Sequence, residues 1–268
     1  MGRNKIDRTG ETNISNEGCV MRIVEYNNCD DIIIQFEDEY KYRLHTKYKH
    51  FKNGQCKNPY FASVFGHGYW GVDVNGNVPK TAELKEGKLC ATQEYQKWQN
   101  MLQRCFDNKY KEKYPTYKGV ICCERWLCFT NFLEDFEILK QEYNWSNDEK
   151  LNLDKDILNK GNKIYSLENC VLVPNWINML FTKCDASRGN YPIGVSKKNK
   201  KYQAHCSVNG KQTRLGLYNT IEEAFNAYKQ AKENEIKRIA YDCVSKGFMT
   251  KDSRLYNVMI SYQIEIDD

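Results

Sequence analysis

The segment from residue 188 to residue 246 constrains the fold most, because it combines three strand patterns, a hairpin turn and a capped helix. Strands are predicted at residues 191–196, 202–208 and 212–218. Asn209-Gly210 joins the last two strands as a two-residue hairpin turn. Thr220 and Glu223 form a capping-box pattern at the start of the helix. Because one helix can cover only one face of a three-stranded sheet, the other face must meet solvent or a ligand.

The positive charge of the chain is concentrated in these strands. The whole sequence carries 40 basic and 35 acidic residues, a net charge of +5. Residues 188–218 contain no acidic residue, and their basic residues are Arg188, Lys197, Lys198, Lys200, Lys201, Lys211 and Arg214. Such a sheet is predicted to bind nucleic-acid phosphates. The alternative is a solvated basic surface, although soluble surfaces usually mix both signs.

Four short motifs follow one another in this segment: Tyr191-Pro192-Ile193-Gly194-Val195, Tyr202-Gln203-Ala204, Leu215-Gly216-Leu217-Tyr218 and Thr220-Ile221-Glu222-Glu223-Ala224. Together they resemble an AP2-type DNA-binding domain, with Tyr202 where that family usually has tryptophan. The resemblance implies a three-stranded sheet, backed by a helix, that contacts the major groove of double-stranded DNA. The DNA-facing candidates that it implies are Lys198, Lys201, Gln203, His205, Arg214 and Tyr218.

Residues 92–182 have the pattern of two helices followed by a strand–loop–strand–helix unit. Aromatic and apolar residues recur every three to four positions at residues 92–106 and 129–143, which predicts two helices with buried faces. Short strands are predicted at residues 151–154 and 170–173. Pro174 suits the first turn of a following helix, where its missing N–H is harmless.

The motifs of this block are Trp98-Gln99-Asn100-Met101-Leu102-Gln103-Arg104-Cys105, Cys123-Glu124-Arg125-Trp126, Leu153-Asp154-Lys155-Asp156 and Tyr165-Ser166-Leu167-Glu168-Asn169-Cys170, followed by Asn178. In this order they resemble phage-encoded HNH endonucleases, also called His-Me finger or ββα-metal nucleases. The resemblance covers roughly residues 92–182. It implies hydrolysis of DNA phosphodiester bonds with a divalent metal, and delivery to a site by the AP2-like domain, as in homing endonucleases.

The resemblance also implies a role for individual residues. Asp154 on the first strand and Asn178 in the helix are the implied metal ligands, and their oxygen atoms suit Mg²⁺. Asn169 is implied to hold the intervening loop. Lys155 stands where the family has its general-base histidine, and the four histidines are His45, His50, His67 and His205. A lysine is a poor base at neutral pH unless desolvation lowers its pKa. Lys155 could therefore act as a base or hold phosphate, or His67 could reach the metal-bound water.

The sequence therefore predicts a multidomain α+β protein. The expected parts are a small N-terminal β module (1–90), the HNH-like ββα-metal block with flanking helices (91–182), the AP2-like three-stranded antiparallel sheet plus helix (183–246) and a tail (247–268). The N-terminal strands are predicted at residues 20–26 and 32–36, with a hairpin centred on Asn75-Gly76. Alternation at residues 258–266 predicts a strand in the tail, which would need a partner edge in this chain or in a homodimer.

The twelve cysteines favour buried thiols over a structural zinc site, because no Cys-x-x-Cys pair is present. No apolar stretch is long enough for a membrane helix, and no secretory signal is visible, so no membrane partner is expected. The resemblance implies the cytoplasm of a phage-infected or prophage-bearing bacterial cell. Three functions remain open: a Mg²⁺-dependent DNA endonuclease, a non-catalytic DNA-binding regulator or phage interference protein on a degenerate nuclease scaffold, and a protein-interaction factor that uses the tail strand.

Overall fold

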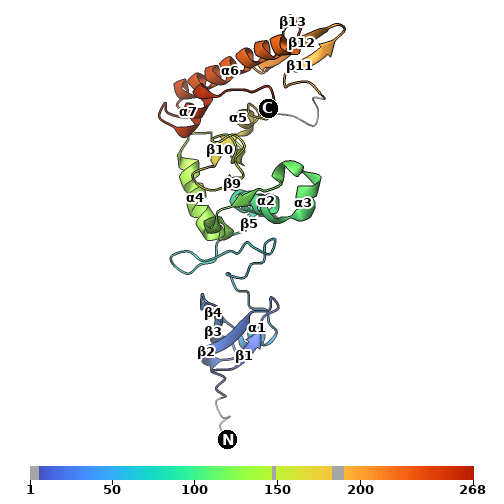
Figure 1. The fold of residues 1–268 in the computed structure, drawn as a ribbon. Coiled ribbons are helices and arrows are strands. Elements are labelled where there is room, and N and C mark those ends of the chain that lie inside the picture. The colour runs from blue at the N-terminus through green and yellow to red at the C-terminus, as the bar shows by residue number, and fades with distance from the viewer. Residues whose placement is uncertain (1–5, 147–148, 183–189) are drawn as a thin grey trace. The chain divides into compact units, whose positions relative to one another are not determined.

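The computed structural model describes residues 6–146, 149–182 and 190–268. It is a mixed α+β structure with several small sheets, and it divides into two compact units, Met1–Asp135 and Phe136–Asp268. Figure 1 labels their elements. The predicted α+β class is confirmed. The boundary between the units falls inside the predicted block 91–182, and the second unit includes the ββα strands, the C-terminal sheet and the tail.

The first unit begins with a four-stranded antiparallel sheet in the order β1-β2-β3-β4. Its strands are β1 (Thr12–Ile14), β2 (Val20–Asn28), β3 (Asp31–Phe36) and β4 (Arg43–Thr46), and helix α1 (Tyr48–Lys52) follows. Alternate residues of β2 and β3 are fully buried, including Met21, Ile23, Ile32 and Ile34. This alternation is typical of strands with one covered face, and the strands predicted at residues 20–26 and 32–36 are both confirmed.

The predicted hairpin around Asn75-Gly76 is wrong, because residues 71–78 form a turn without strands. Asp73 Oδ1 accepts hydrogen bonds from the backbone N–H of Asn75 (2.8 Å) and of Asn77 (2.8 Å). An aspartate that bonds its own backbone in this way competes with a strand ladder. A hairpin lies further along, between β5 (Ala82–Lys85) and β6 (Lys88–Ala91).

The rest of the first unit is mainly helical. Its elements are α2 (Gln93–Phe106), α3 (Asn108–Lys113), the 3₁₀ helix η1 (Pro115–Tyr117), β7 (Ile121–Cys122) and the 3₁₀ helix η2 (Glu124–Leu127). Helix α4 (Phe129–Gln141) begins in this unit and ends in the second. Thr92 caps α2 by accepting from the N–H of Tyr95, and Trp98 in α2 is fully buried, with Nε1 donating to the carbonyl of Trp126. Both predicted helices are confirmed.

The second unit contains the predicted strand–loop–strand–helix order. Strand β8 (Leu151–Asp154) pairs antiparallel with β10 (Val171–Pro174), and α5 (Asn175–Asn178) follows β10 directly. The short strand β9 (Ile164–Tyr165) lies in the intervening loop. Next come β11 (Val195–Lys198), β12 (Lys201–Val208) and β13 (Lys211–Tyr218), then α6 (Ile221–Ser245) and α7 (Arg254–Ser261).

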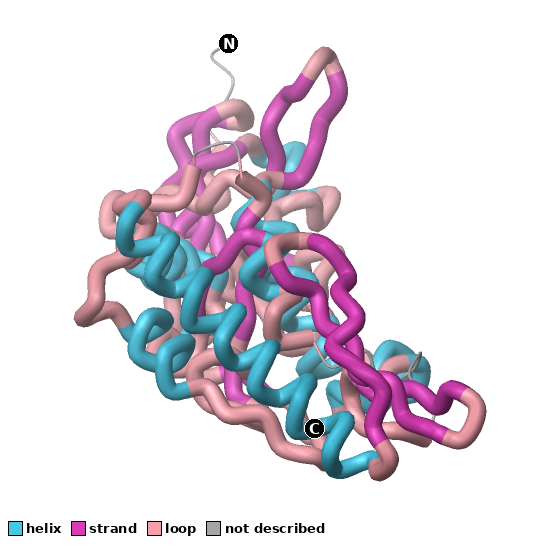
Figure 2. The backbone as a smooth tube through the Cα atoms, turned by 90° about the horizontal axis from the view of Figure 1, so that it is seen from above, coloured by secondary structure: helices cyan, strands magenta, loops and turns pink. Residues whose placement is uncertain are grey.

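Helix α6 contributes to two hydrophobic cores. Ala224, Phe225 and Tyr228 in its first half pack against the sheet β11–β13. In its second half, Ile236 and Ala240 join the core of the ββα unit and α7. Figures 1 and 2 show the strands of the sheet beside one part of this long helix only. The ββα unit, the C-terminal sheet and the tail, which the sequence predicts as separate parts with boundaries at residues 182 and 246, therefore all pack against α6.

The strand predicted at residues 258–266 is wrong, because residues 254–261 form helix α7. Ser253 caps this helix by accepting from the N–H of Tyr256. Leu255, Tyr256 and Met259 are buried on one helical face. Apolar and polar side chains alternate at residues 258–266, and this pattern predicts a strand. The burial of Leu255 and Tyr256 in the first turn of α7 decides for a helix instead. A homodimer through a tail strand therefore loses its basis.

Gly194, directly before β11, lies against the ring of Tyr228 in α6. Its φ is +76°, and a Cβ atom there would lie 2.0 Å from Cδ2 of the Tyr228 ring. We expect Gly194→Ala to lower the free energy of unfolding by about 3–5 kcal/mol, since backbone strain and overpacking add. The measurement is chemical denaturation followed by circular dichroism.

The matched control is Gly210→Ala. Gly210 has φ +72°, and a methyl group added there would meet no atom within 4 Å, so only backbone strain of about 1–2 kcal/mol is expected. Equal destabilisation of the two variants would contradict the close contact between Gly194 and Tyr228.

Candidate functional site

The sheet β11–β13 has one covered and one open face. Ala204 and Cys206 of the central strand are buried under α6, and Tyr202 and Val208 have the same parity. The residues between them, Lys201, Gln203, His205 and Ser207, therefore face the other side. The register places Ser196 opposite Gln203 and Arg214 opposite His205.

The open face gathers most of the predicted DNA-facing residues. These are Lys198 on β11, Lys201, Gln203 and His205 on β12, and Arg214 on β13. Lys198, Lys201 and Arg214 are exposed. No aspartate or glutamate occurs in residues 188–218, so the cations of this face have no acidic neighbour within the sheet. The arrangement is a positively charged surface with polar side chains at its centre.

The other predicted residues lie elsewhere. Lys197 pairs with Tyr202 and Lys211 pairs with Val208, so both have the parity of the covered face, although each is exposed at a strand end. Lys200 lies in the turn between β11 and β12. Arg188 is outside the described residues. Tyr218 packs against the core beneath α6, which differs from its expected place on the DNA-facing side.

Glu235 of α6 holds the tip of the sheet. Its carboxylate accepts a hydrogen bond from the backbone N–H of Asn209 (2.8 Å) and is paired with Arg238 (2.8 Å). Asn209 and Gly210 have φ of +52° and +72°, the conformation of a type I′ hairpin turn. The hydrogen bonds from Arg238, and that from Asn209, lower the pKa of Glu235. The acidic group thus fixes the turn from the covered side.

Asp154 lies at the end of β8. Its Oδ1 accepts hydrogen bonds from the backbone N–H of Asp156 (2.7 Å) and of Ile157 (2.9 Å). Burial raises the pKa of Asp154 against the effect of these two bonds. Among the hydrogen bonds within the described residues, those that Asp154 accepts go to Oδ1, which leaves Oδ2 to bind a ligand.

Lys155 is buried, with an exposed fraction of 5%. Its Nζ donates to both carboxylate oxygens of Asp156 (2.7 and 2.6 Å) and to the carbonyl of Asn162 (2.8 Å). The side chain of Asn162 in turn donates to the carbonyl of Lys155 (2.8 Å). These contacts close the loop after β8 around the ammonium group.

Asn169 and Asn178 have different surroundings. Asn169 accepts from Nδ2 of Asn159 (3.1 Å) and donates to Oγ of Ser166 (3.1 Å), so it joins two parts of the loop. Asn178 is half-buried at the end of α5, where its carbonyl accepts from Oγ1 of Thr182 (3.2 Å). Asp154 and Asn178 belong to one strand–strand–helix unit.

The donor set suits Mg²⁺ better than zinc. Asp154 and Asn178 offer two oxygen ligands, and Mg²⁺ commonly keeps several waters beside one or two protein oxygens. Residues 6–146, 149–182 and 190–268 contain no group of three or more histidine, cysteine or acidic side chains placed to hold a metal. A hydrogen bond to Cys105, with burial, raises the pKa of Cys122. Cys184 lies outside the described residues.

The end of the chain borders the same loop. Lys160 is paired with Asp268, and its Nζ lies 5.9 Å from the ring centroid of Tyr262. Burial raises the pKa of Tyr262 to about 12, and the charges of Asp268 and Asp154 add to this rise. The ring of Tyr262 meets that of Phe181 edge-on at 4.9 Å. Sequence reasoning missed these neighbours because it placed residues 258–266 in a strand.

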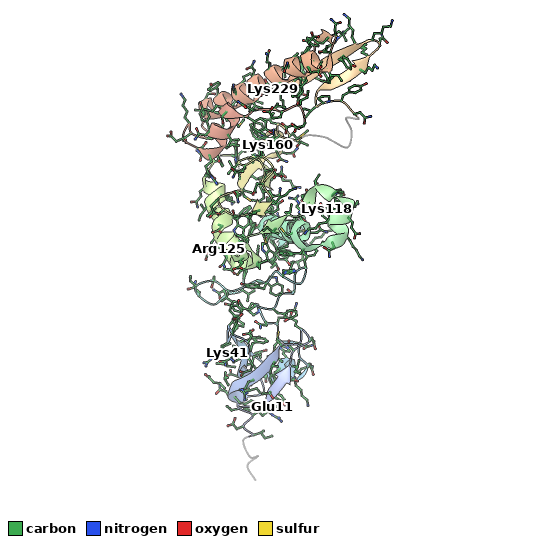
Figure 3. All side chains as sticks on the ribbon, viewed as in Figure 1. Glu11, Lys41, Lys118, Arg125, Lys160 and Lys229 are labelled. Atoms are coloured by element: carbon green, nitrogen blue, oxygen red, sulfur yellow. The ribbon has the colours of Figure 1, made fainter. Side chains whose placement is uncertain are left out.

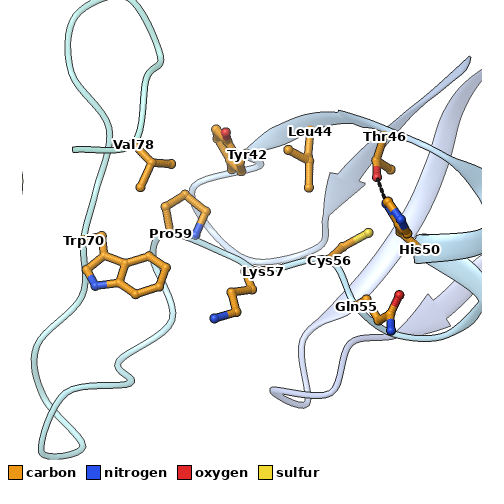
Figure 4. Close-up of a pocket in the computed structure, with 10 residues that line it drawn as sticks. All are labelled: Tyr42, Leu44, Thr46, His50, Gln55, Cys56, Lys57, Pro59, Trp70 and Val78. Atoms are coloured by element: carbon orange, nitrogen blue, oxygen red, sulfur yellow. Dashed lines mark hydrogen bonds between the residues drawn. The ribbon is translucent and has the colours of Figure 1, made fainter. Parts of the chain in front are cut away.

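Two features of the first unit are further candidates for a site. His67 stacks on Phe106, with 3.9 Å between ring centroids, and its predicted action at the metal stays a hypothesis. A cavity of about 260 Å³ is lined by residues that include Tyr42, Lys57 and Trp70 (Figure 4). The Nζ of Lys57 lies 5.5 Å from the Trp70 ring centroid, and none of the predicted site residues lines this cavity.

No protein-family model, curated protein or solved structure matches this chain. Within the part of the chain that the structure describes, no helix is both long and apolar enough to span a membrane. Two features of the second unit carry the chemistry described above, the open face of the sheet β11–β13 and the loop after β8.

The pairing of Glu235 predicts a pH-dependent stability. Folding lowers the pKa of Glu235, so its charged carboxylate stabilises the fold at pH values above the unfolded-state pKa of 4.5. This stabilisation is lost as the pH falls through the folded-state pKa. We expect Glu235→Gln to cost about 2 kcal/mol at pH 7, because it removes a charged acceptor.

The measurement is the free energy of unfolding of both proteins from pH 7 down to the acidic range. The difference between them should shrink as the wild type protonates Glu235. A difference that stays constant with pH would show that the charge of Glu235 does not stabilise the turn.

Proposed function

We propose that this protein binds double-stranded DNA through the open face of the sheet β11–β13. The observation that carries the proposal is that Lys198, Lys201 and Arg214 share this exposed face and no acidic residue lies in the sheet. Cations that replace condensed counterions on phosphates supply most of the affinity of such proteins. A solvated surface without a ligand gains nothing from collecting one sign of charge.

The centre of the face has the chemistry to read bases. Arg214 lies directly opposite His205, and Gln203 lies two residues further along the same face of β12. An arginine can donate two hydrogen bonds to guanine, and a glutamine can bond both groups of adenine in the major groove. Lys198 and Lys201 at the strand ends then contact phosphates and set the orientation.

A second candidate function is Mg²⁺-dependent hydrolysis of a DNA phosphodiester at Asp154, as in a phage- or mobile-element-type HNH endonuclease. The supporting observation is a partly buried carboxylate at the end of β8, with Oδ1 held by two backbone N–H groups and Oδ2 available. Asp154 and Asn178 would hold the ion, which stabilises negative charge on the leaving oxygen when bound. The contacts of Lys155 favour positioning of the loop, through Asp156 and Asn162, over proton transfer.

The alternative to hydrolysis is a non-catalytic DNA-binding regulator or interference protein on the same scaffold. Two observations support this alternative. Lys155 is held inside its own loop by Asp156, and residues 136–204 contain no histidine that could act as the base instead. DNA binding is common to both candidates.

Neutralising the open face tests DNA binding. We expect the triple variant Lys198→Gln, Lys201→Gln, Arg214→Gln to make the fall of log affinity with log salt shallower. The magnitude of the slope should decrease by about 0.9 for each phosphate that is no longer neutralised, or roughly 2–3 in total. Fluorescence anisotropy of a labelled duplex over a salt series measures this slope.

The matched control replaces Lys237, Lys246 and Lys251 with glutamine, which removes the same charge from α6 and the segment before α7. Its slope should stay near that of the wild type. An equal effect of the two triple variants would show that net charge, and not the open face, determines binding.

Cleavage is tested with supercoiled DNA and Mg²⁺. We expect Asp154→Ala to reduce the nicking rate by about a thousandfold, since a metal ion supplies several kcal/mol of transition-state stabilisation. The exposed Asp252→Ala is the control, and gel electrophoresis of the nicked form is the measurement.

The outcomes separate the two candidates. Absence of nicking by the wild type, with DNA binding intact, would leave the non-catalytic function. Nicking that is unchanged in Asp154→Ala would overturn Asp154 as the metal ligand.

A further inference from the structure

A second basic surface lies in the first unit, around α3 and η1. We call it the tyrosine surface and define it by Arg104, Lys109, Tyr110, Lys113, Tyr114, Tyr117 and Lys118. The Tyr110 ring packs against the other two, with its centroid 4.7 Å from that of Tyr114 and 5.6 Å from that of Tyr117. Lys118 marks its position in Figure 3. The surface is thus a row of aromatic rings with cations around it.

Local structure explains why these rings come together. Asp107 caps α3 by accepting from the N–H of Tyr110 (3.1 Å), which fixes the first ring at the start of the helix. Pro115 opens η1 and turns the chain, so that Tyr114 and Tyr117 both lie against the Tyr110 ring. Tyr114 remains 40% exposed.

The rings are accompanied by positive charge. Residues 104–118 contain five basic and two acidic residues. The guanidinium carbon of Arg104 lies 5.3 Å from the Tyr117 ring centroid, and Nζ of Lys113 lies 5.3 Å from that of Tyr114. Lys109, Lys113 and Lys118 are exposed, and no ion pair between described residues includes them.

This composition matches one class of ligand. Aromatic rings provide stacking platforms for unpaired bases, and surrounding lysines follow the phosphates of the strand. In a duplex the faces of internal bases are stacked on one another, so an exposed ring such as that of Tyr114 has no base face to meet. Short α3 with its charge row also lacks the continuous apolar stripe that a protein partner would bury.

We propose that the tyrosine surface binds single-stranded nucleic acid, with a base stacked on Tyr114 and phosphates held by Lys109, Lys113 and Lys118. This function is separate from duplex binding by the sheet and does not depend on it. An unpaired strand could be DNA or RNA, since both offer the same bases and phosphates.

The test uses the full chain, with labelled oligothymidine and oligouridine as probes, in a background that carries Lys198→Gln, Lys201→Gln and Arg214→Gln. We expect Tyr114→Ala to weaken binding by about tenfold and Tyr114→Phe to bind like the parent protein, because stacking needs the ring and not the hydroxyl. Replacing Lys109, Lys113 and Lys118 with glutamine should lower the salt slope by about 0.7 for each phosphate that is no longer neutralised, or roughly 2 in total.

The controls have the same chemistry elsewhere in the chain. Tyr241, which is 56% exposed and touches Tyr256, is replaced by alanine, and Lys49, Lys52 and Lys80 are replaced by glutamine. Neither control should change binding of the single strand. Circular dichroism establishes that each variant is folded, and the variant with Lys109, Lys113 and Lys118 replaced by glutamine tests the surface independently if Tyr114→Ala does not fold.

The outcomes decide the proposal. Binding of either oligomer with the expected weakening in Tyr114→Ala supports it, and the tighter of the two identifies the natural strand. Absence of single-strand binding by the parent protein overturns it, as does equal binding of Tyr114→Ala and the parent. Because the sheet is already neutralised in this background, failure here leaves the duplex-binding proposal intact, and failure of duplex binding leaves this one intact.

Discussion

The second unit depends on the burial of one face of α6. This helix of 25 residues is about 37 Å long, and its buried side chains form two groups, residues 224–228 in the first half and residues 235–243 in the second. Phe225 and Tyr228 cover the sheet β11–β13, while Ile236 and Ala240 join the core that contains Val171 and Val173 of the ββα unit. Because each half of this rigid helix buries apolar side chains in a different core, it holds the sheet β11–β13 and the strands of the ββα unit on one element. The candidate DNA-binding sheet and the candidate metal ligand are therefore carried by a common support.

The strands β11–β13 and the helix that covers them differ in charge. Helix α6 contains both acidic and basic residues, and one of its acids, Glu235, is buried where it holds the hairpin turn. The charged residues of the strands are all basic, so the face away from α6 carries an uncompensated positive potential. The positive charge of the sheet therefore lies on the face that α6 leaves open, and Glu235 lies on the covered side.

The residue after Asp154 determines which chemistry the loop after β8 can support. A histidine after Asp154 would offer a neutral base near pH 7, whereas Lys155 offers a cation that Asp156 and the carbonyl of Asn162 enclose. The ammonium group of Lys155 is buried, whereas its partner Asp156 is about half exposed. The two backbone hydrogen bonds to Oδ1 of Asp154 do not involve the side chain of Lys155, so the proposed metal binding and the proposed proton transfer can be tested separately.

The sequence by itself determined the local structures that depend on neighbouring residues. The Asn209-Gly210 turn, the Thr220–Glu223 capping box, helix α2 with its apolar face and the strands β8 and β10 all follow from it, because turn conformations, caps and apolar periods are short-range properties. The resemblance to AP2-type domains implied Lys198, Lys201 and Arg214 as DNA-facing residues, whereas the register shift between Ala204 and His205 decides that Arg214 and Tyr218 lie on opposite faces. The prediction of a strand at residues 258–266 failed for the opposite reason, because Leu255 and Met259 are buried by distant parts of the chain. The hairpin predicted at residues 71–78 failed because of a competing local interaction, since Asp73 accepts hydrogen bonds from the backbone of Asn75 and Asn77. Only the tertiary structure decided that Tyr218 lies in the core, that Lys155 is enclosed and that Tyr262 approaches Asp154, since each depends on burial by residues far away in the sequence.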